Sequence, residues 1–458
     1  MTSRSSRRQF LIRGAAIGGA AAFGSPLVPA RPTPRTEPAA RRRPSANERL
    51  RIGVIGCGGK GFSDMQACAV NHDIVALCDV DENQAARARA AHPKAAFFHD
   101  WRDMLDTQVL DAVTISTPDH SHAGPALTAM AKGLHVFVQK PLTHTVAEAR
   151  RLRDAARKTG VITSMGNQGT CLDGLRTAVE CVRAGAIGTV RDVHVWTNRP
   201  IWPQGIGRPR HIDPIPATLR WDLWLGPAAW RSYAAGRKGG TFRGYAPFHW
   251  RGFWDFGTGA LGDMACHLAN MPFLALGLGD PDWVEATSNE GGNSETAPKR
   301  SVIRFHFPPR GDRGEVVMHW YDGGALPPRE LLPGVRLRAG GFLLVGDRGK
   351  LYSPTDYGER FELHPKEEFA DFTPPPHTLP RSPGIHEEWL QGILDDSQPM
   401  ANFEYAAPFT EAILLGNLAL RCEHRIEWDA PNLRVKNSRA AQQLVSKHYR
   451  RGFELPDV

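Results

Sequence analysis

Two residues one helical turn apart, Asp263 and His267, carry side chains suited to removing a proton from an alcohol. Residues four apart share one face of a helix, and an unperturbed histidine titrates near neutral pH, so the pair suits general base catalysis. Lys140 follows an apolar segment, and its charge could ease deprotonation of the same hydroxyl. The alternatives are structural: Asp263 caps a helix, His267 is buried on its apolar side, and Lys140 is a surface residue before a turn.

A glycine-rich turn near the start of the chain predicts a partner for that chemistry. Residues 51–61 form an apolar strand that runs into Gly-x-Gly-x-x-Gly and then into a helical pattern. Such a turn brings backbone N–H groups to a pyrophosphate at a helix N-terminus. The next strand ends at Asp79, which can bind an adenine ribose diol, and no Arg or Lys follows it to receive a 2′-phosphate. This favours NAD over NADP, the alternative being a plain turn with a surface acid. The predicted cofactor contacts here are Gly56, Gly58, Gly59, Lys60, Gly61 and Asp79.

Two more loops follow predicted strands, at the carboxyl ends where ligands gather in doubly wound sheets. Residues 116–122 read Ser-Thr-Pro-Asp-His-Ser-His, and residues 139–141 read Gln-Lys-Pro. The His-x-His pair has no Cys or carboxylate cluster to complete a metal site, so we expect no metal. The further predicted cofactor contacts are Thr117, Pro118, His122, Gln139 and Lys140.

Aromatic loops precede the helix of Asp263 and predict a sugar site. Indole rings stack well on the CH face of a pyranose, and nearby Arg and Asp side chains can bind hydroxyls. The alternative is that these aromatic residues form ordinary core. The candidate substrate contacts are Trp202, His249, Trp250, Arg251 and Asp255.

As a set, these motifs resemble the Gfo/Idh/MocA family of oxidoreductases. The resemblance covers about residues 50–430 and includes residues 257–267, Gly-Thr-Gly-Ala-Leu-Gly-Asp-Met-Ala-Cys-His. It implies an NAD(P)-dependent enzyme with a polyol-class substrate. Most members have Glu-Lys-Pro where this chain has glutamine at position 139, a change that alters how the lysine is oriented or charged. With residues 165–169 and 196–202, the glutamine variant resembles an exported branch of the family.

The element pattern predicts an α/β fold. An N-terminal Rossmann domain with a doubly wound parallel sheet precedes a C-terminal α+β domain with a large, mostly antiparallel sheet. The strands expected in the first sheet are 51–55, 74–79, 112–116, 135–139 and 161–165, with helices clearest at 122–132 and 146–158. Those expected in the second are 190–196, 302–307, 315–320 and 342–345. Helices are expected at 172–184, 384–395 and 404–422, the last two packing back on the first domain.

The first residues predict export. Ser-Arg-Arg-Gln-Phe-Leu at residues 6–11 opens an apolar stretch that is shorter than the roughly 18 residues needed to span a membrane. We expect a twin-arginine signal, a periplasmic location and no stable membrane insertion after cleavage. The predicted segments are a signal peptide (1–30), a disordered linker (31–48), an NAD-binding Rossmann domain (49–170), a substrate-binding α+β domain (171–430) and a C-terminal tail (431–458).

The charge distribution argues against a nucleic-acid-binding protein, and the cysteine spacing argues against a disulfide framework. The net charge of +8 comes mostly from residues 1–48, which hold nine arginines and two glutamates, so a nucleic-acid partner is not expected. Seven cysteines without a Cys-x-x-Cys pair fit buried thiols of a protein folded in the reducing cytoplasm.

The residues therefore predict an NAD-dependent oxidoreductase acting on a hydroxyl of a sugar or glycoside with a retained cofactor. One alternative is a redox-neutral glycosidase or lyase that oxidises C3, eliminates the C1 substituent, adds water and reduces the ring again. Another is a non-catalytic sugar- or NAD-binding protein. A homo-oligomer is expected because a face of the second sheet needs cover.

Overall fold

The computed structural model describes residues 45, 48–237, 240, 242 and 244–458. The predicted twin-arginine signal and nearly all of the predicted linker lie outside these residues, so both stay predictions. The proposed division into domains also stays a prediction.

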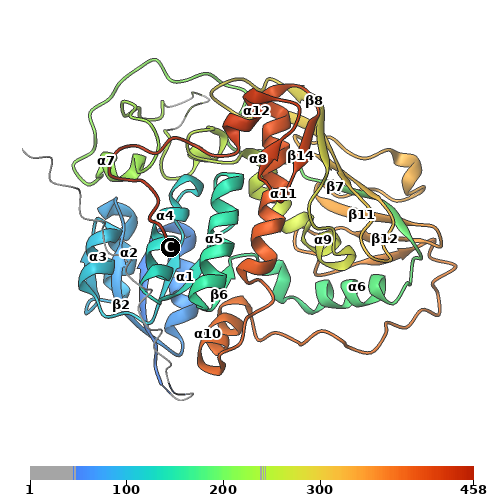
Figure 1. Cartoon of the computed structure of the whole chain (residues 1–458), viewed down its shortest axis with the longest axis horizontal. Coiled ribbons are helices and arrows are strands. Elements are labelled where there is room, and N and C mark those ends of the chain that lie inside the picture. Colours follow the sequence, from blue (N-terminus) through green and yellow to red (C-terminus); the bar gives the residue numbers. More distant parts are fainter. Residues whose placement is uncertain (1–44, 46–47, 238–239, 241, 243) are drawn as a thin grey trace, which may run out of the picture. The chain divides into compact units, whose positions relative to one another are not determined.

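The first sheet has six parallel strands in the order β3-β2-β1-β4-β5-β6 (Figure 1). Its central strands are buried on both sides, which explains why their sequences read as continuous apolar runs rather than as alternating ones. Strand order reverses between β1 and β4, and this switch point is where a doubly wound sheet binds ligands. The strands are β1 (Arg51–Ile55), β2 (Asp73–Cys78), β3 (Ala96–Phe98), β4 (Ala112–Ile115), β5 (His135–Val138) and β6 (Thr163–Met165).

Helices connect these strands as the alternation predicts. Their bounds are α1 (Gly59–Ala69), α2 (Glu82–Ala91), α3 (Trp101–Thr107), α4 (Ala123–Ala131) and α5 (Val146–Thr159). α5 begins with a capping box, in which Thr145 accepts from the backbone N–H of Glu148 and Glu148 accepts from that of Thr145. The sequence pattern missed β3, which is only three residues long.

The second sheet has nine strands in the order β13-β12-β11-β7-β10-β9-β8-β14-β15. Among the pairings of this second sheet in the described residues, only β7–β10 is parallel, so the mostly antiparallel prediction is confirmed. β8 was missed because its polar second half is largely exposed and carries no apolar alternation. The strands are β7 (Val190–Trp196), β8 (Trp283–Glu290), β9 (Arg300–Phe307), β10 (Val316–Tyr321), β11 (Gly341–Gly346), β12 (Lys350–Ser353), β13 (Glu362–His364), β14 (Ile426–Asp429) and β15 (Arg434–Val435).

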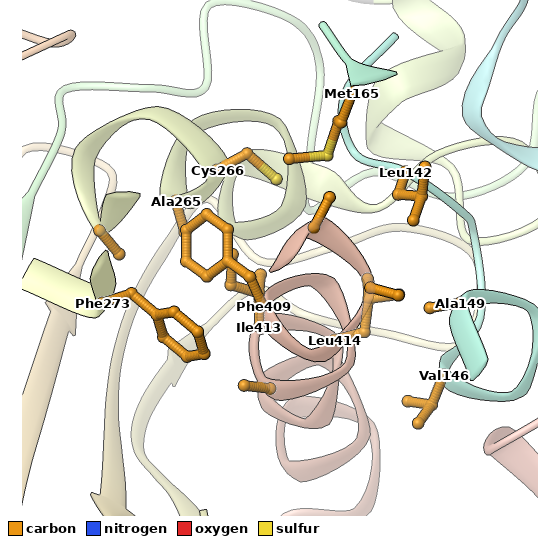
Figure 2. Packing of buried hydrophobic residues seen from close by; sticks show 14 of the residues in the cluster. Leu142, Val146, Ala149, Met165, Ala265, Cys266, Phe273, Phe409, Ile413 and Leu414 are labelled. Carbon is orange, nitrogen blue, oxygen red and sulfur yellow. The ribbon is translucent and has the colours of Figure 1, made fainter. Parts of the chain in front are cut away.

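The long helix α11 (Phe403–Cys422) lies between the two sheets and is apolar on nearly every side. In Figure 2, Phe409 and Ile413 face Ala265 and Phe273, while Leu414 faces the α5 side. A buried ion pair between Arg150 and Glu411 (Nη2 to Oε2, 2.7 Å) adds a polar link to α5.

Helix α10 (Ile385–Asp395) packs on α1, and its Trp389 is fully buried beside β5 and β6. The expectation that the two late helices pack against the first sheet is therefore confirmed. The remaining helices are α6 (Asp173–Arg183), α7 (Trp221–Leu225), α8 (Gly259–Leu268), α9 (Asn270–Leu276) and α12 (Arg439–Leu444).

One face of the large sheet carries the side chains of Trp196, Leu343 and Tyr352, and the loop between β10 and β11 covers part of it. Leu332 and Ala325 pack on Trp196, Leu343 and Tyr352 of that face. Among the described helices, none combines the length and apolar character that crossing a membrane requires.

Candidate active site

The glycine-rich turn lies at the carboxyl end of β1 and leads directly into α1. Gly56 has a φ of +78°, and a Cβ there would lie 2.8 Å from the carbonyl oxygen of Ser116. A Cβ on Gly61 would lie 1.7 Å from the carbonyl oxygen of Gly56, so only glycine lets α1 approach β1 this closely. The turn thus carries the geometry that nucleotide-binding turns require.

Asp79 follows β2 and faces this turn. Its Oδ2 accepts from the backbone N–H groups of Cys57 (3.0 Å) and Gly58 (3.1 Å), and its Oδ1 accepts from that of Asp81 (3.0 Å). Burial raises the pKa of Asp79 to about 6, against the lowering effect of these hydrogen bonds. The carboxyl group is therefore held at the mouth of the turn, where a ribose diol would meet it.

A cavity of about 470 Å³ begins at the glycine-rich turn and extends to Lys140, Arg251 and Asp263. Nine predicted cofactor contacts line it: Gly56, Gly58, Gly59, Lys60, Asp79, Thr117, Pro118, Gln139 and Lys140.

Gly61 and His122 lie behind the cavity wall rather than on its surface. Gly61 serves the packing of α1 on β1, as described above. The ring nitrogens of His122 face the carbonyl oxygens of Pro141 (2.9 Å) and Thr117 (2.9 Å). His122 therefore joins the two loops that follow β4 and β5, and it acts on any cofactor through them.

His120 lines the cavity, with its ring nitrogens facing the carbonyl oxygens of Phe256 (3.2 Å) and Trp224 (3.1 Å). Burial, together with the charge of Lys447, lowers its pKa to about 3, so the ring is neutral at pH 7. Within the part of the chain that the structure describes, no cluster of three or more His, Cys, Asp or Glu is arranged to hold a metal ion.

At the other end of the cavity, Lys140 and Asp263 form an ion pair. Lys140 Nζ donates to Asp263 Oδ1 (2.9 Å) and to the Asp263 carbonyl oxygen (2.9 Å), and Arg251 Nε lies 3.3 Å from the same Oδ1. Although burial opposes ionisation, the charges of Lys140 and Arg251 hold the pKa of Asp263 below its usual value. The pair joins the end of β5 to the first turns of α8.

His267 lies one turn further along α8, as the spacing predicts, but it does not line the cavity. Asn167 Nδ2 donates to the Cys266 carbonyl oxygen (2.6 Å), which turns Asn167 Oδ1 toward His267 Nδ1 (3.2 Å). In that arrangement Nδ1 carries the proton and Nε2 keeps its lone pair. Asn167 is a supporting residue that the sequence reasoning did not assign.

The expectation that His267 titrates near neutral pH is wrong. Burial, followed by the positive charge of Lys140, lowers the pKa of His267 to about 3 despite the opposing charge of Asp263. The imidazole is therefore neutral throughout the physiological range.

Asp64 of α1 is a buried carboxylate that the sequence did not reveal. It lies behind residues 139–141, the loop that carries Lys140. It accepts from Lys60, from Ser116 Oγ (2.9 Å), from Gln139 Nε2 (2.8 Å) and from His386 Nε2 (2.9 Å). Burial opposes its ionisation, but His386 and Lys60 lower its pKa below the usual value.

This arrangement explains the glutamine before Lys140. An amide at position 139 donates to Asp64, whereas a glutamate there would place a second carboxylate against a buried one. Gly166 makes room, because a Cβ on it would lie 2.6 Å from Gln139 Nε2.

Of the candidate sugar contacts, Trp250 and Arg251 line the cavity. The Arg251 guanidinium lies over the rings of Phe248 (4.3 Å) and Trp250 (4.4 Å). These contacts hold its positive charge beside Asp263.

The other three candidates are not brought to the cavity surface. Trp202 is buried and donates to Gln204 Oε1 (2.8 Å), and Asp255 forms an ion pair with Arg231. His249 is the first residue of a short helical turn, His249–Gly252, that also contains Trp250. The aromatic loop is thus mainly core, which was the structural alternative for these residues.

Comparison with known proteins accords with this geometry. Residues 50–167 match the family model described as "Oxidoreductase family, NAD-binding Rossmann fold", and residues 202–287 match "Oxidoreductase family, C-terminal alpha/beta domain". The chain belongs to the Gfo/Idh/MocA oxidoreductase family.

Curated relatives match over a limited part of the chain. Glycosyl hydrolase family 109 protein 1 of Shewanella sp. (strain ANA-3) is 36% identical over 123 residues, which is 24% of this chain and 27% of that protein. An alpha-N-acetylgalactosaminidase of Shewanella oneidensis is 35% identical over 123 residues, with the same shares. The match therefore spans about a quarter of the length of these relatives.

Solved structures share the fold over most of the chain. The WlbA dehydrogenase from Bordetella pertussis, in complex with NADH and UDP-GlcNAcA, has a TM-score of 0.57 at 18% identity and covers 83% of this chain and 99% of its own. A levoglucosan dehydrogenase in complex with NADH and levoglucosan has a TM-score of 0.56 at 17% identity and covers 84% and 100%. At these identities the likeness shows a common fold.

Proposed function

We propose that this protein is an NAD-dependent oxidoreductase that acts on a hydroxyl group of a sugar or glycoside. The observation that carries the proposal is the Lys140–Asp263 pair, which lies in the same cavity as the glycine-rich turn and Asp79. Bound NAD would accept a hydride from the carbinol carbon. The chain's own residues then have to bind the hydroxyl, hold its developing charge and receive its proton.

Lys140 is the group best placed to bind the hydroxyl oxygen, because its ammonium lines the cavity and is oriented by Asp263. A positive charge there stabilises an alkoxide. His267, neutral and with a lone pair on Nε2, is the proposed proton acceptor; because its ring does not line the cavity, the proton would have to reach it through a group that does. Asp263 lies one turn before it and stays ionised, which offsets the charge of the lysine.

We propose NAD rather than NADP as the cofactor. With a pKa of about 6, Asp79 is mostly ionised at pH 7 and faces the position of the adenine ribose, so a 2′-phosphate would meet a negative charge. A competition titration of the two nucleotides tests this, and tighter binding of NADP would overturn it.

Export with a retained cofactor is also a proposal. The sequence at residues 6–11 supports a twin-arginine signal, a route that carries folded proteins. A periplasmic enzyme without a free NAD pool has to regenerate its cofactor on the same site. Replacing Arg7 and Arg8 with lysine should leave the enzyme in the cytoplasm, and normal processing of that variant would exclude the signal.

A redox-neutral glycosidase is the second candidate, and the partial match to glycosyl hydrolase family 109 favours it. In this route C3 is oxidised, the acidified C2 proton is removed, the C1 substituent leaves, water adds and the hydride returns to C3. Substrate is thus hydrolysed with no net change in NAD.

One experiment separates the two candidates. Single-turnover absorbance at the NADH band is followed after a panel of glycosides and free sugars is added, without free NAD, and the products are analysed. Transient NADH with a cleaved glycoside favours the redox-neutral route. Persistent NADH that only a second carbonyl compound clears favours the oxidoreductase. If no sugar reduces the bound nucleotide, both enzymatic candidates fail, and the remaining alternative is a non-catalytic sugar- or NAD-binding protein.

A homo-oligomer remains part of the proposal. The loop between β10 and β11 covers one portion of the sheet face that carries Trp196. Two stacked imidazole rings, those of His194 and His319, lie on the same face, with their centroids 4.7 Å apart. Light scattering of the purified protein tests the oligomeric state.

A further inference from the structure

The last residues of the chain, 445–458, cross from α12 to the helices of the first sheet. We call this segment the C-terminal strap. In Figure 1 it is the dark red trace that runs from α12 past α7 to the chain end beside α4. Arg102 of α3 donates to the Gly452 carbonyl oxygen (2.5 Å), and Arg151 of α5 donates to that of Pro456 (2.7 Å).

The first half of the strap is anchored on a buried carboxylate. Lys447 Nζ pairs with Glu148 (2.9 Å) and donates to the His120 carbonyl oxygen (2.9 Å). Tyr449 donates its hydroxyl to the same carboxylate (2.9 Å). Because Glu148 is buried and also belongs to the capping box of α5, the strap is tied to the rigid part of the fold.

The second half is anchored on both sides of the cavity mouth. The backbone N–H of Arg450 donates to the Pro227 carbonyl oxygen (3.1 Å), and its Nε donates to that of Gly226 (2.9 Å). The guanidinium of Arg102 lies over the Phe453 ring (4.5 Å). The strap thus bridges the loop after α7 and the start of α3.

Three strap side chains, Tyr449, Phe453 and Leu455, line the same cavity as the glycine-rich turn. Two other lining residues, His99 and Trp101, follow β3, which pairs with β2. In the strand order β3-β2-β1-β4-β5, the β3 end lies on the opposite side of the turn from Lys140. Asp79 at the end of β2 marks the adenine ribose, so the β3 side is where the adenine belongs.

We propose that the C-terminal strap is part of the cofactor site. Phe453 and Leu455 form an apolar wall against the adenosine half of NAD, and the anchors on Glu148 and Arg102 keep that wall closed. The inference rests on the proposed NAD-dependent function and gives a physical basis for cofactor retention. NAD leaves only when the strap detaches.

The test compares Phe453→Ala/Leu455→Ala with wild type, using Arg451→Ala, an exposed strap position, as the control. Protein loaded with NAD is diluted into excess ADP-ribose, and the nucleotide that remains bound is measured over time. Removing these two half-buried apolar side chains from the cavity wall should raise the dissociation rate by about tenfold to a hundredfold. Arg451→Ala should stay within about twofold of wild type.

Binding of ADP-ribose, which lacks the nicotinamide, should weaken by the same factor as binding of NAD. Equal dissociation rates in wild type and double variant would overturn the strap proposal while leaving the NAD-dependent function intact. A loss seen with NAD but not with ADP-ribose would also overturn it. A wild-type protein that binds neither nucleotide would overturn the proposed function itself.

A milder variant covers the case in which the double variant fails to fold. Tyr449→Phe keeps the ring and removes only the hydrogen bond to Glu148, so the dissociation rate should rise about twofold to tenfold. An unchanged rate in a folded Tyr449→Phe protein would count against the anchors.

Discussion

The two ends of the cavity are built in different ways. At the nucleotide end, the glycine-rich turn presents mostly backbone: glycines whose missing side chains allow close approach, and an aspartate that follows the next strand. At the lysine end, the wall consists of charged side chains from α8, from the loop before it and from the end of β5. Backbone geometry depends on a short stretch of sequence, whereas a charged wall depends on segments far apart in the chain. Substitutions at the two ends should therefore have separable effects, on binding and on rate.

The largest effect is expected at the lysine end. Lys140→Ala removes the charge that stabilises the alkoxide, so hydride transfer in single turnover should fall by about 10²–10⁴-fold, roughly 3–5 kcal/mol of barrier. The amount of bound NAD should change far less, because the pyrophosphate and the adenine ribose bind at the other end; nucleotide released on denaturation measures it. A variant that loses both hydride transfer and NAD binding would contradict the separation of the two ends.

The nucleotide end should show the converse. Asp79→Ala should weaken NAD binding by about 1.5–3 kcal/mol, because a charged hydrogen-bond acceptor for the ribose is lost. Titration calorimetry gives the affinity, and single-turnover rates at saturating NAD should match wild type. A slower rate at saturation would show that the two ends are coupled.

A smaller effect is expected from the carboxylate that connects the two ends. Asp64→Asn should lower the free energy of unfolding by about 1–2 kcal/mol at pH 7, because Lys60 and His386 lose their ionised partner. The folded pKa of Asp64 is depressed, so its contribution is present above the unfolded pKa and is lost as the pH falls through the folded value.

Urea denaturation of wild type and Asp64→Asn at several pH values measures this. The difference between them should be largest at neutral pH and should shrink below about pH 4. A difference that stays constant into acid would mean that Asp64 is not ionised in the folded protein.

The smallest expected effect concerns His267, which should not titrate in the neutral pH range. With a pKa of about 3, His267 should cause no inflection in the pH–rate profile between about pH 5 and 8. Its folded pKa lies below the unfolded value, so the unfolded state binds the extra proton and stability should decline as the pH falls below about 6.5. An inflection near neutral pH that His267→Ala abolishes would show that His267 titrates as an ordinary histidine.

Several features of the site were readable from the sequence because they are local. The strand, glycine-rich turn and helix at 51–69 follow from consecutive residues, and Asp79 is the next strand end. The four-residue spacing of Asp263 and His267 needed only a helix, which α8 supplies. The prediction of a sugar site in the aromatic loop was only partly right, because the same residue types suit a protein core and a sugar-binding surface. Trp202 and Asp255 bind partners away from the cavity.

The order of residues along the chain determined the parallel sheet, the nucleotide turn and the helix that carries Asp263, since hydrogen-bonded elements and turns depend on neighbouring residues. Only the tertiary structure decided which groups surround them. Asp64 meets His386 across 322 positions, Asn167 meets His267 across 100, and Arg102 meets the C-terminal strap across 350. Such contacts set pKa values and close the cavity through burial and charge, and these depend on packing rather than on sequence proximity.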